Sequence, residues 1–329
     1  MRPSCPNQRR GEPAPARTGI EKTQRGPVVS PMAVSRFLPE GRRVYPLMTI
    51  TTRDPNRALW EARARGEATP AWESLSSEPD GIEQENVDVP AGLRLRPPGA
   101  ATGAVVLAIH GGGFVSGSVA THRRMFGHLA RAAGAATLAV EYGLVPDHVF
   151  PSQLDSVVAA YQWLLDRGAT DVAVAGDSSG ATLALGLAVR VRDEGLPRPA
   201  SLLLMSAWTD LEATGASYDS GRDPFFTREL VRGLAAGYLA GADRRDPLAS
   251  PLHADVRRLP PTYLQAGGEE SLLDDSKRLA VRLRDAGVDV RLDEFAGQVH
   301  TFQMGAGRTR VADDAIGRGG SWLRSTLMS

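Results

Sequence analysis

The sequence contains a single cysteine, Cys5, among its 329 residues, so no disulfide can form within the chain. Having no disulfide framework fits a reducing compartment, and we expect a cytoplasmic protein. No apolar run is long enough to span a bilayer, and the N-terminus has no apolar stretch of the kind found in secretory signals. We therefore expect no integral membrane segment.

The chain also carries no excess of charge of either sign. Its formal net charge is zero and its pI is about 7.0, so nothing indicates a nucleic-acid partner or an anionic surface. Lysine is almost absent, with only Lys22 and Lys277, and arginine supplies nearly all of the positive charge. We attribute this bias to codon usage rather than to function.

Residues 1–31 are rich in proline and arginine and show no hydrophobic periodicity, which predicts a disordered tail. Met32 and Met48 are plausible alternative starts of the chain. The remaining length, 32–329, fits a single α/β domain that carries insertions.

From about residue 83 onward, short apolar runs alternate with amphipathic stretches. This alternation predicts an α/β fold with a mainly parallel, doubly wound sheet. Gly134 is expected to end one helix, and Ser152 and Gly168 to cap the next. The expected strands cover 104–110, 136–142, 171–176, 201–208, 262–267 and 288–297, and the expected helices cover 122–134, 152–168, 181–195, 273–287 and a stretch after about 309.

The pentapeptide GDSSG, residues 176–180, matches G-x-S-x-G and lies between an expected strand and an expected helix. In that context the glycines allow a tight turn on which Ser178 takes a strained conformation and exposes its hydroxyl as a nucleophile. The alternative is an ordinary helix cap that follows a glycine turn.

A second motif, His110-Gly111-Gly112-Gly113-Phe114, directly follows the strand AVVLAIH. An ester under attack develops an oxyanion that needs donors already in place, and a glycine run leaves its amides unobstructed. A flexible turn and a phosphate-binding loop are the alternatives. Neither the G-x-G-x-x-G spacing nor the trailing lysine of phosphate loops is present.

These two motifs occur in order with EYGLVPDHVFPSQLDS, SPLHADVRRLPPTYLQAGGEE and GQVHTFQ. Together they resemble the hormone-sensitive-lipase-like family of α/β-hydrolase esterases over roughly residues 80–310. The resemblance implies an α/β-hydrolase fold with a helical cap, and a serine carboxylesterase that needs no metal or organic cofactor. Its members often dimerise, so a homodimer is one expected assembly.

The resemblance also implies roles for the glycine motif. The backbone amides of Gly112, Gly113 and Ser179 would donate to the oxyanion, while His110 and Gly111 would support the loop. The family more often has alanine at position 179, and we expect little consequence because the donor there is backbone. We expect Phe114 and Val115 to line the substrate pocket.

A serine hydroxyl needs a neighbouring imidazole to accept its proton. In α/β-hydrolases the chain order is serine, acid, histidine, and only His253 and His300 follow Ser178. His253 lies in a proline-rich stretch, where we expect a surface histidine. His300 follows the last expected strand, where the resembling family has its catalytic histidine.

The acid should come from AGGEESLLDDS, residues 266–276, which follows an expected strand. The family usually shows Asp-Pro-Leu-x-Asp here, with the first Asp catalytic. Matching that pattern gives Glu270 the catalytic position and Ser271 the position of the proline. Asp274, whose other role would be to favour the helix N-terminus, is the main rival, and Glu269 is a weaker one. Asp275 is expected to face solvent.

Two segments, about 32–80 and 209–258, fall outside the β-α alternation. By resemblance they would form a cap over Ser178, with an apolar pocket beneath it. Most of their aromatic residues would form the cap's own core. Those aromatic residues are Trp60, Trp72, Tyr218, Phe225, Phe226 and Tyr238.

The leading hypothesis is a carboxylesterase for short- to medium-chain acyl esters or lactones, which uses Ser178, Glu270 and His300. A non-catalytic small-molecule receptor on the same fold is the alternative from another class, and the presence of His300 argues against it. Amide or N-acyl hydrolysis by the same triad stays open. A nucleotide-binding domain is disfavoured by the glycine spacing.

Overall fold

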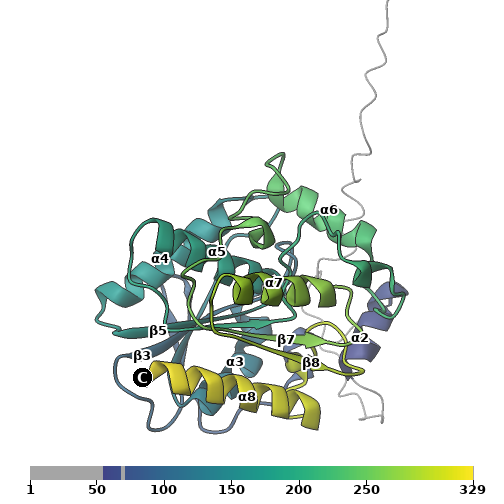
Figure 1. Cartoon of the computed structure of the whole chain (residues 1–329). Coiled ribbons are helices and arrows are strands. Elements are labelled where there is room, and N and C mark those ends of the chain that lie inside the picture. Colours follow the sequence, from purple (N-terminus) through teal and green to yellow (C-terminus); the bar gives the residue numbers. More distant parts are fainter. Residues whose placement is uncertain (1–54, 68–70, 329) are drawn as a thin grey trace, which may run out of the picture.

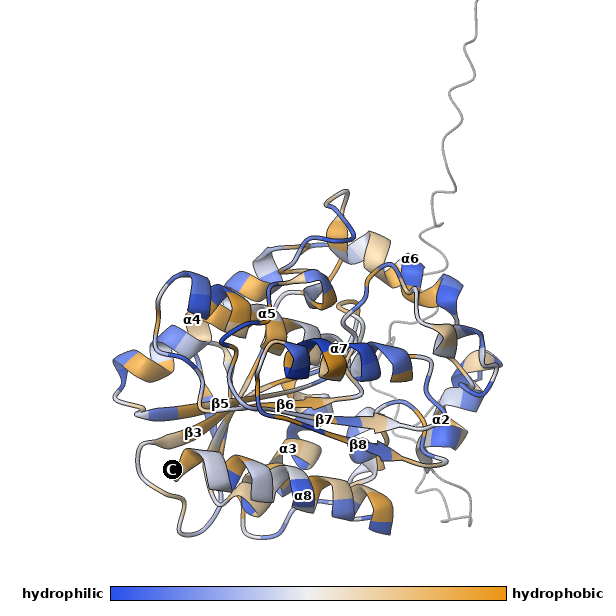
Figure 2. Ribbon diagram, in the orientation of Figure 1, coloured by the Kyte–Doolittle hydropathy of each residue, from blue (hydrophilic) through white to orange (hydrophobic). Residues whose placement is uncertain are grey.

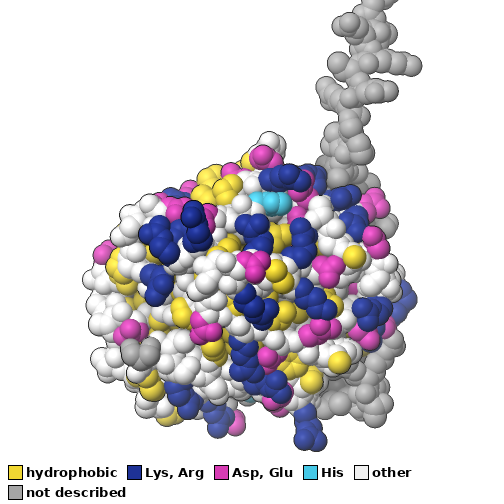
Figure 3. Space-filling model, in the orientation of Figure 1, with side chains coloured by type: hydrophobic (Ala, Val, Ile, Leu, Met, Phe, Trp, Pro, Cys, Tyr) yellow, Lys and Arg dark blue, Asp and Glu magenta, His cyan; other side chains and the backbone are white. Residues whose placement is uncertain are grey.

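The computed structural model describes residues 55–67 and 71–328 (Figure 1). The expected tail, 1–31, and the first part of the expected cap, 32–54, lie outside the described residues. Within the described part, no helix is both long enough and apolar enough to cross a membrane. On the face drawn in Figure 3, basic and acidic side chains are interspersed.

The centre of the molecule is an eight-stranded sheet with the order β1-β2-β4-β3-β5-β6-β7-β8. β2 pairs antiparallel with both β1 and β4, and the pairings from β4 through β8 are parallel. The strands are β1 (Glu83–Val87), β2 (Gly92–Arg96), β3 (Ala104–Ile109), β4 (Ala136–Val140), β5 (Asp171–Asp177), β6 (Leu202–Met205), β7 (Thr262–Gly267) and β8 (Val290–Phe295). The expected mainly parallel sheet is therefore confirmed.

Helices cover both faces of this sheet (Figure 1). One face carries α3 (Val119–Ala133) and α8 (Arg310–Leu327), and the other carries α4 (Ser152–Asp166), α5 (Ser179–Asp193) and α7 (Leu273–Asp285). The apolar strands lie between these two layers and bury one hydrophobic core against each (Figure 2).

The remaining elements lie beyond the carboxyl ends of the parallel strands. They are α2 (Pro55–Ala64), α6 (Arg228–Leu239) and the short 3-10 turns η1 (Trp72–Leu75), η2 (Ala216–Asp219), η3 (Pro251–His253) and η4 (Phe302–Gly305). α2, η1, α6 and η2 come from the two segments that break the β-α alternation.

The sequence missed the two antiparallel strands, β1 and β2, and misplaced several helix ends. β1 reads EQENV, and four of its five residues are exposed, so it has no apolar pattern to detect. Gly134 does end α3, in the left-handed conformation. The prediction for α4 was wrong at both ends: Pro151 is its N-cap and Arg167 its C-cap.

Strand register brings the two glycine motifs together. Ile109 at the end of β3 pairs with Gly176 near the end of β5. The segments that follow, which begin at His110 and Asp177, therefore leave the sheet side by side. This is the carboxyl edge of the parallel strands, where binding sites of open α/β sheets lie.

Candidate active site

Ser178 occupies the sharp turn between β5 and α5, with φ 52° and ψ −119°. Two glycines make this turn possible. A Cβ at Gly176 would lie 2.4 Å from the carbonyl oxygen of Gly180, and a Cβ at Gly180 would lie 2.1 Å from that of Ile109. Because both obstacles are backbone atoms, neither position accepts a side chain without moving the sheet or the helix.

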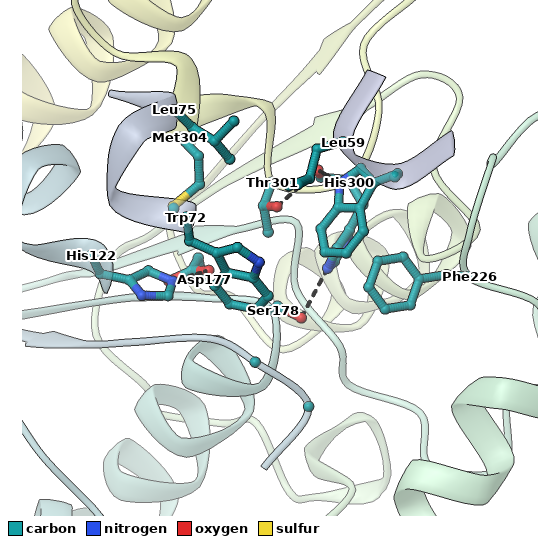
Figure 4. Close-up of a pocket in the computed structure, with 13 residues that line it drawn as sticks. Leu59, Trp72, Leu75, His122, Asp177, Ser178, Phe226, His300, Thr301 and Met304 are labelled. Atoms are coloured by element: carbon teal, nitrogen blue, oxygen red, sulfur yellow. Dashed lines mark hydrogen bonds and ion pairs between the residues drawn. The ribbon is translucent and has the colours of Figure 1, made fainter. Parts of the chain in front are cut away.

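Three side chains that are far apart in the sequence meet at this turn, and Figure 4 shows two of them, Ser178 and His300. His300 Nε2 lies 2.9 Å from Ser178 Oγ, and His300 Nδ1 lies 3.2 Å from Glu270 Oε2. Glu270 comes from the loop between β7 and α7, and His300 from the loop between β8 and η4. A proton on Nδ1 that is donated to Glu270 leaves the Nε2 lone pair free to accept the serine proton.

The electrostatics of Glu270 follow from its position. Its side chain is buried, and burial raises the pKa of the carboxyl above its ordinary value. The adjacent His300 imidazole offsets part of this rise, and so does the Ser206 hydroxyl. A carboxylate in this setting favours a positive charge on the imidazole beside it.

Two other acids of the same stretch are bound elsewhere. Asp274 Oδ2 accepts a hydrogen bond from the backbone N–H of Ser217, at 2.9 Å. Glu269 forms an ion pair with Arg57. Of the four acids in the stretch, Glu270 is the one that the structure brings to the histidine.

Asp275 does not face solvent, so that prediction was wrong. Its side chain is fully buried, and Oδ2 accepts the backbone N–H groups of Thr209 and Asp210, both at 2.9 Å. The Tyr218 hydroxyl donates to Oδ1 at 3.2 Å. Burial raises the pKa of Asp275 to about 8, and these donors offset part of the rise. Asp275 thus fastens the segment after β6 onto α7.

The glycine loop is held by buried polar side chains. The backbone N–H of Gly111 donates to Asp177 Oδ1 at 3.0 Å, and His122 Nε2 lies 3.4 Å from Asp177 Oδ2. The ring of His110 lies with Nδ1 2.8 Å from the carbonyl oxygen of Gly111. It also stacks on the Tyr142 ring, with centroids 4.2 Å apart. The loop is therefore fixed at its start.

At the end of the loop, the hydroxyl of Ser179 makes a contact that its sequence position did not suggest. The backbone N–H of Gly113 donates to Ser179 Oγ at 3.0 Å. An alanine at this position could not accept that hydrogen bond. The Ser179 side chain therefore binds the glycine loop directly to the first turn of α5.

A pocket with about 380 Å³ of atom-free space opens above Ser178 (Figure 4). Its walls are mostly apolar, and much of them comes from the segments outside the β-α alternation. The lining residues are Leu59, Trp60, Trp72, Leu75, Gly112, Gly113, His122, Asp177, Ser178, Phe226, His300, Thr301 and Met304.

Neither Phe114 nor Val115, which we expected in the pocket, is among its lining residues. Phe114 is fully buried and stacks on Tyr238, with ring centroids 3.6 Å apart. Its positive φ of 64° turns the chain at the end of the glycine loop. The aromatic walls are instead supplied by Trp60, Trp72 and Phe226.

Sequence reasoning missed several residues that support the site. Trp60 Nε1 donates to the carbonyl oxygen of His300 at 3.0 Å. His122 and Asp177 are both almost fully buried beside the pocket. Asp177 could have been suspected from its place inside GDSSG. His122 could have been suspected from its place on the apolar face of its helix. Trp60 was expected among the aromatic residues of the cap, but no sequence signal pointed to its hydrogen bond with His300.

Asp210, Glu212 and His253 place three ligand atoms within 4.8 Å of one another, a grouping that could hold a cation. Arginines already occupy the two carboxylates: Arg278 pairs with Asp210 at 2.7 Å, and Arg245 pairs with Glu212 at 2.7 Å. We therefore interpret the group as an ion-pair network. We expected His253 at the surface, and it is partly exposed, with a quarter of its side chain accessible to solvent.

A family model described as the alpha/beta hydrolase fold matches residues 106–304. An acetyl-hydrolase of Streptomyces hygroscopicus is 40% identical over 209 residues, which cover 62% of this chain and 70% of the relative. The putative acetyl-hydrolase LipR of Mycobacterium tuberculosis is 32% identical over 255 residues, which cover 76% and 82%. An esterase of Acinetobacter venetianus is 37% identical over 205 residues, which cover 61% and 68%.

Solved structures agree with these relatives. An esterase from the bacterial hormone-sensitive lipase family superposes with a TM-score of 0.77 at 38% identity, covering 85% of this chain and 100% of that one. A crystal structure of EstE5 soaked with p-nitrophenyl butyrate superposes with a TM-score of 0.76 at 34% identity, covering 84% and 99%.

Proposed function

Because this chain belongs to the α/β-hydrolase-fold family, among the hormone-sensitive-lipase-like esterases, and is a carboxylesterase, we propose that Ser178, His300 and Glu270 hydrolyse short-chain acyl esters. The observation that carries the proposal is the continuous contact from Ser178 Oγ through the His300 ring to Glu270 Oε2, at 2.9 and 3.2 Å.

In this mechanism His300 Nε2 accepts the hydroxyl proton while Ser178 Oγ attacks the ester carbonyl. Glu270 stabilises the resulting imidazolium and holds its orientation. The imidazolium then gives its proton to the departing alcohol, which leaves an acyl group on Ser178. A water molecule, deprotonated by the same histidine, attacks that acyl-enzyme and releases the acid.

The oxyanion would be held by backbone amides at the floor of the pocket. Gly112 lines the pocket, and the amide of Ser179 lies at the N-terminus of α5 beside the nucleophile. The amide of Gly113 is engaged with Ser179 Oγ. To bind the oxyanion, this N–H would have to break its hydrogen bond to Ser179 Oγ or donate to both oxygens at once.

The cap would consist of the segments 55–80 and 209–258, with 32–54 as a further proposed part. Support comes from Trp60, Trp72 and Phe226, which reach from these segments into the pocket above Ser178. A narrow, mostly apolar pocket suits a short acyl group. The names of the acetyl-hydrolase relatives point in the same direction.

The test is a series of p-nitrophenyl esters, from acetate to decanoate, with wild type and Ser178→Ala. Wild type should prefer acyl groups of about two to six carbons. Ser178→Ala should lose about 10³-fold or more of kcat. Near-wild-type turnover by Ser178→Ala would refute the mechanism, and absence of turnover in folded wild type would favour the receptor alternative.

The same assay with a p-nitroanilide separates amide hydrolysis, which should be far slower. Size-exclusion chromatography with light scattering tests the homodimer that we propose for this enzyme. A monomer at micromolar concentration would contradict it.

A further inference from the structure

The loop that carries Glu270 is bound to the proposed cap by hydrogen bonds that converge on Asp223. This residue lies between η2 and α6. One of its carboxylate oxygens, Oδ1, accepts the backbone N–H groups of Phe225 and Phe226 at 2.9 and 2.8 Å. The other, Oδ2, accepts the backbone N–H of Ser271 at 2.8 Å. One side chain thus satisfies three backbone donors from two separate segments.

Ser271 makes a second connection between the same segments, because its hydroxyl donates to the carbonyl oxygen of Phe226. The residue is buried, so these hydrogen bonds are shielded from water. In the pattern that this chain resembles, proline stands at position 271, and proline has neither an N–H group nor a hydroxyl. The first connection therefore needs a residue other than proline at position 271, and the second needs its hydroxyl.

The two ends of this connection return to the same histidine. Glu270, the residue before Ser271, contacts His300 Nδ1, and the Phe226 ring lies edge-on to the His300 ring with centroids 4.4 Å apart. Phe226 also lines the pocket above Ser178. A shift of the 223–226 turn would therefore move a pocket wall and the acid loop together.

Resting on the proposed role of Glu270, we propose that Asp223 is a positioning residue that couples the cap to the catalytic acid. It holds Ser271, and through it Glu270, at the distance from His300 that proton transfer needs. The same carboxylate fixes Phe226 as a wall of the acyl pocket. The hydrogen bonds of Asp223 then determine both the catalytic rate and the acyl-chain preference.

Asp223→Asn should break the hydrogen bond to Ser271 and keep the two hydrogen bonds within the 223–226 turn. The single amide oxygen stays with the two N–H groups of the 223–226 turn, since two hydrogen bonds outweigh one. The NH₂ group then faces the N–H of Ser271, donor against donor. Asp223→Ala removes all three hydrogen bonds. Asp219→Asn is the matched control: Asp219 is an exposed acid of the same segment that pairs with Arg228.

The experiment measures kcat and KM for p-nitrophenyl acetate, butyrate and hexanoate at a fixed pH, with thermal unfolding of each variant. Asp223→Asn should lower kcat for acetate about 10-fold with KM within about 2-fold, and Asp223→Ala should lower it at least as much. Asp223→Ala should also change the ratio of hexanoate to acetate turnover. Asp219→Asn should match wild type in kcat, in KM and in the ratio of hexanoate to acetate turnover.

Wild-type kcat in Asp223→Asn would overturn the proposal. If only Asp223→Ala then lost activity, Asp223 would support its own turn and would not couple that turn to Glu270. Glu270→Ala in the same assay separates this from the proposed function. An active Glu270→Ala refutes the triad, whereas an inactive Glu270→Ala beside a fully active Asp223→Asn refutes the coupling alone.

Discussion

The floor and the roof of the pocket are built in different ways. The floor consists of loops that leave the sheet, and there backbone atoms come so close that Gly176 and Gly180 cannot carry a side chain. The roof consists of α2, η1 and the loop before α6, and there side chains such as Trp60 and Phe226 make the surface. Gly233 lies on α6, the helix that follows this loop, and has open space where a Cβ would go.

This difference separates chemistry from selectivity. Proton transfer and oxyanion binding need atoms fixed to a fraction of an ångström, which close-packed backbone on a rigid sheet provides. The choice of acyl group depends on the shape of an apolar space, which side chains on a cap can vary. Changes to the floor should therefore abolish turnover, and changes to the roof should redirect it.

The largest difference is expected between two glycine-to-alanine substitutions. Gly180→Ala places a Cβ 2.1 Å from a backbone oxygen, so we expect loss of about 100-fold or more of the activity, with a large drop in melting temperature. Gly233→Ala, within α6, should stabilise the protein by about 0.5–1 kcal/mol. Thermal unfolding and ester turnover measure both variants. A well-folded, active Gly180→Ala would contradict the close backbone contact at Gly180.

A second pair of variants tests which acid belongs to the floor. Glu270→Ala should lower kcat about 100-fold or more, because the imidazolium loses its partner. Asp274→Ala should stay within about 5-fold of wild type, because Asp274 binds the Ser217 amide rather than His300. Turnover of p-nitrophenyl acetate at saturating substrate measures both. The reverse outcome would assign the role to Asp274.

A smaller effect is expected from opening the roof. Trp72→Ala removes part of the pocket wall, so the ratio of kcat/KM for p-nitrophenyl octanoate to that for acetate should rise about 10-fold. The acetate rate itself should change little. Trp163→Ala is the control, because Trp163 lies on α4, stacks with Arg167 and is not a lining residue of this pocket. An unchanged ratio in Trp72→Ala would mean that this wall does not determine which acyl groups the enzyme accepts.

A change of stability with pH is expected from Asp275, which binds the segment after β6 to α7. Its folded pKa of about 8 lies above the value of about 3.9 in an unfolded chain, so between these pH values the folded state retains a proton that the unfolded state has lost. Stability should therefore fall as pH rises through this window, by at most about 1.4 kcal/mol per pH unit.

Asparagine cannot titrate, so the stability difference between wild type and Asp275→Asn should shift against wild type from pH 5 to pH 8. Urea unfolding at the two pH values measures it. In the Asp219→Asn control, the Arg228 partner holds the pKa of Asp219 below its ordinary value, and the difference from wild type should be independent of pH. A constant difference in Asp275→Asn would mean that Asp275 is ionised throughout.

Much of the parallel sheet could be predicted, because β3 and β5 are continuous apolar runs with turn residues at their ends. The charged edge strand β1 could not be, since edge strands need no apolar face. Among the four acids of 266–276, the resemblance to the family pattern favoured Glu270, and the structure brings that residue to His300. The expectation that Asp275 faces solvent was wrong, because a carboxyl group that accepts two backbone N–H groups can be buried. Asp275 lies on the same buried face of α7 as Leu279, one turn further on.

The sequence by itself determined the family, the parallel part of the sheet and the two glycine motifs, because these rest on local patterns: apolar runs, glycine spacing and the order of motifs along the chain. Only the tertiary structure decided which side chains line the pocket above Ser178. Trp60, Trp72 and Phe226 line the pocket in place of Phe114 and Val115, and they come from segments that are far from the glycine loop in the chain. The link from Asp223 to Ser271 likewise spans 48 positions, and no local pattern encodes a hydrogen bond at that distance.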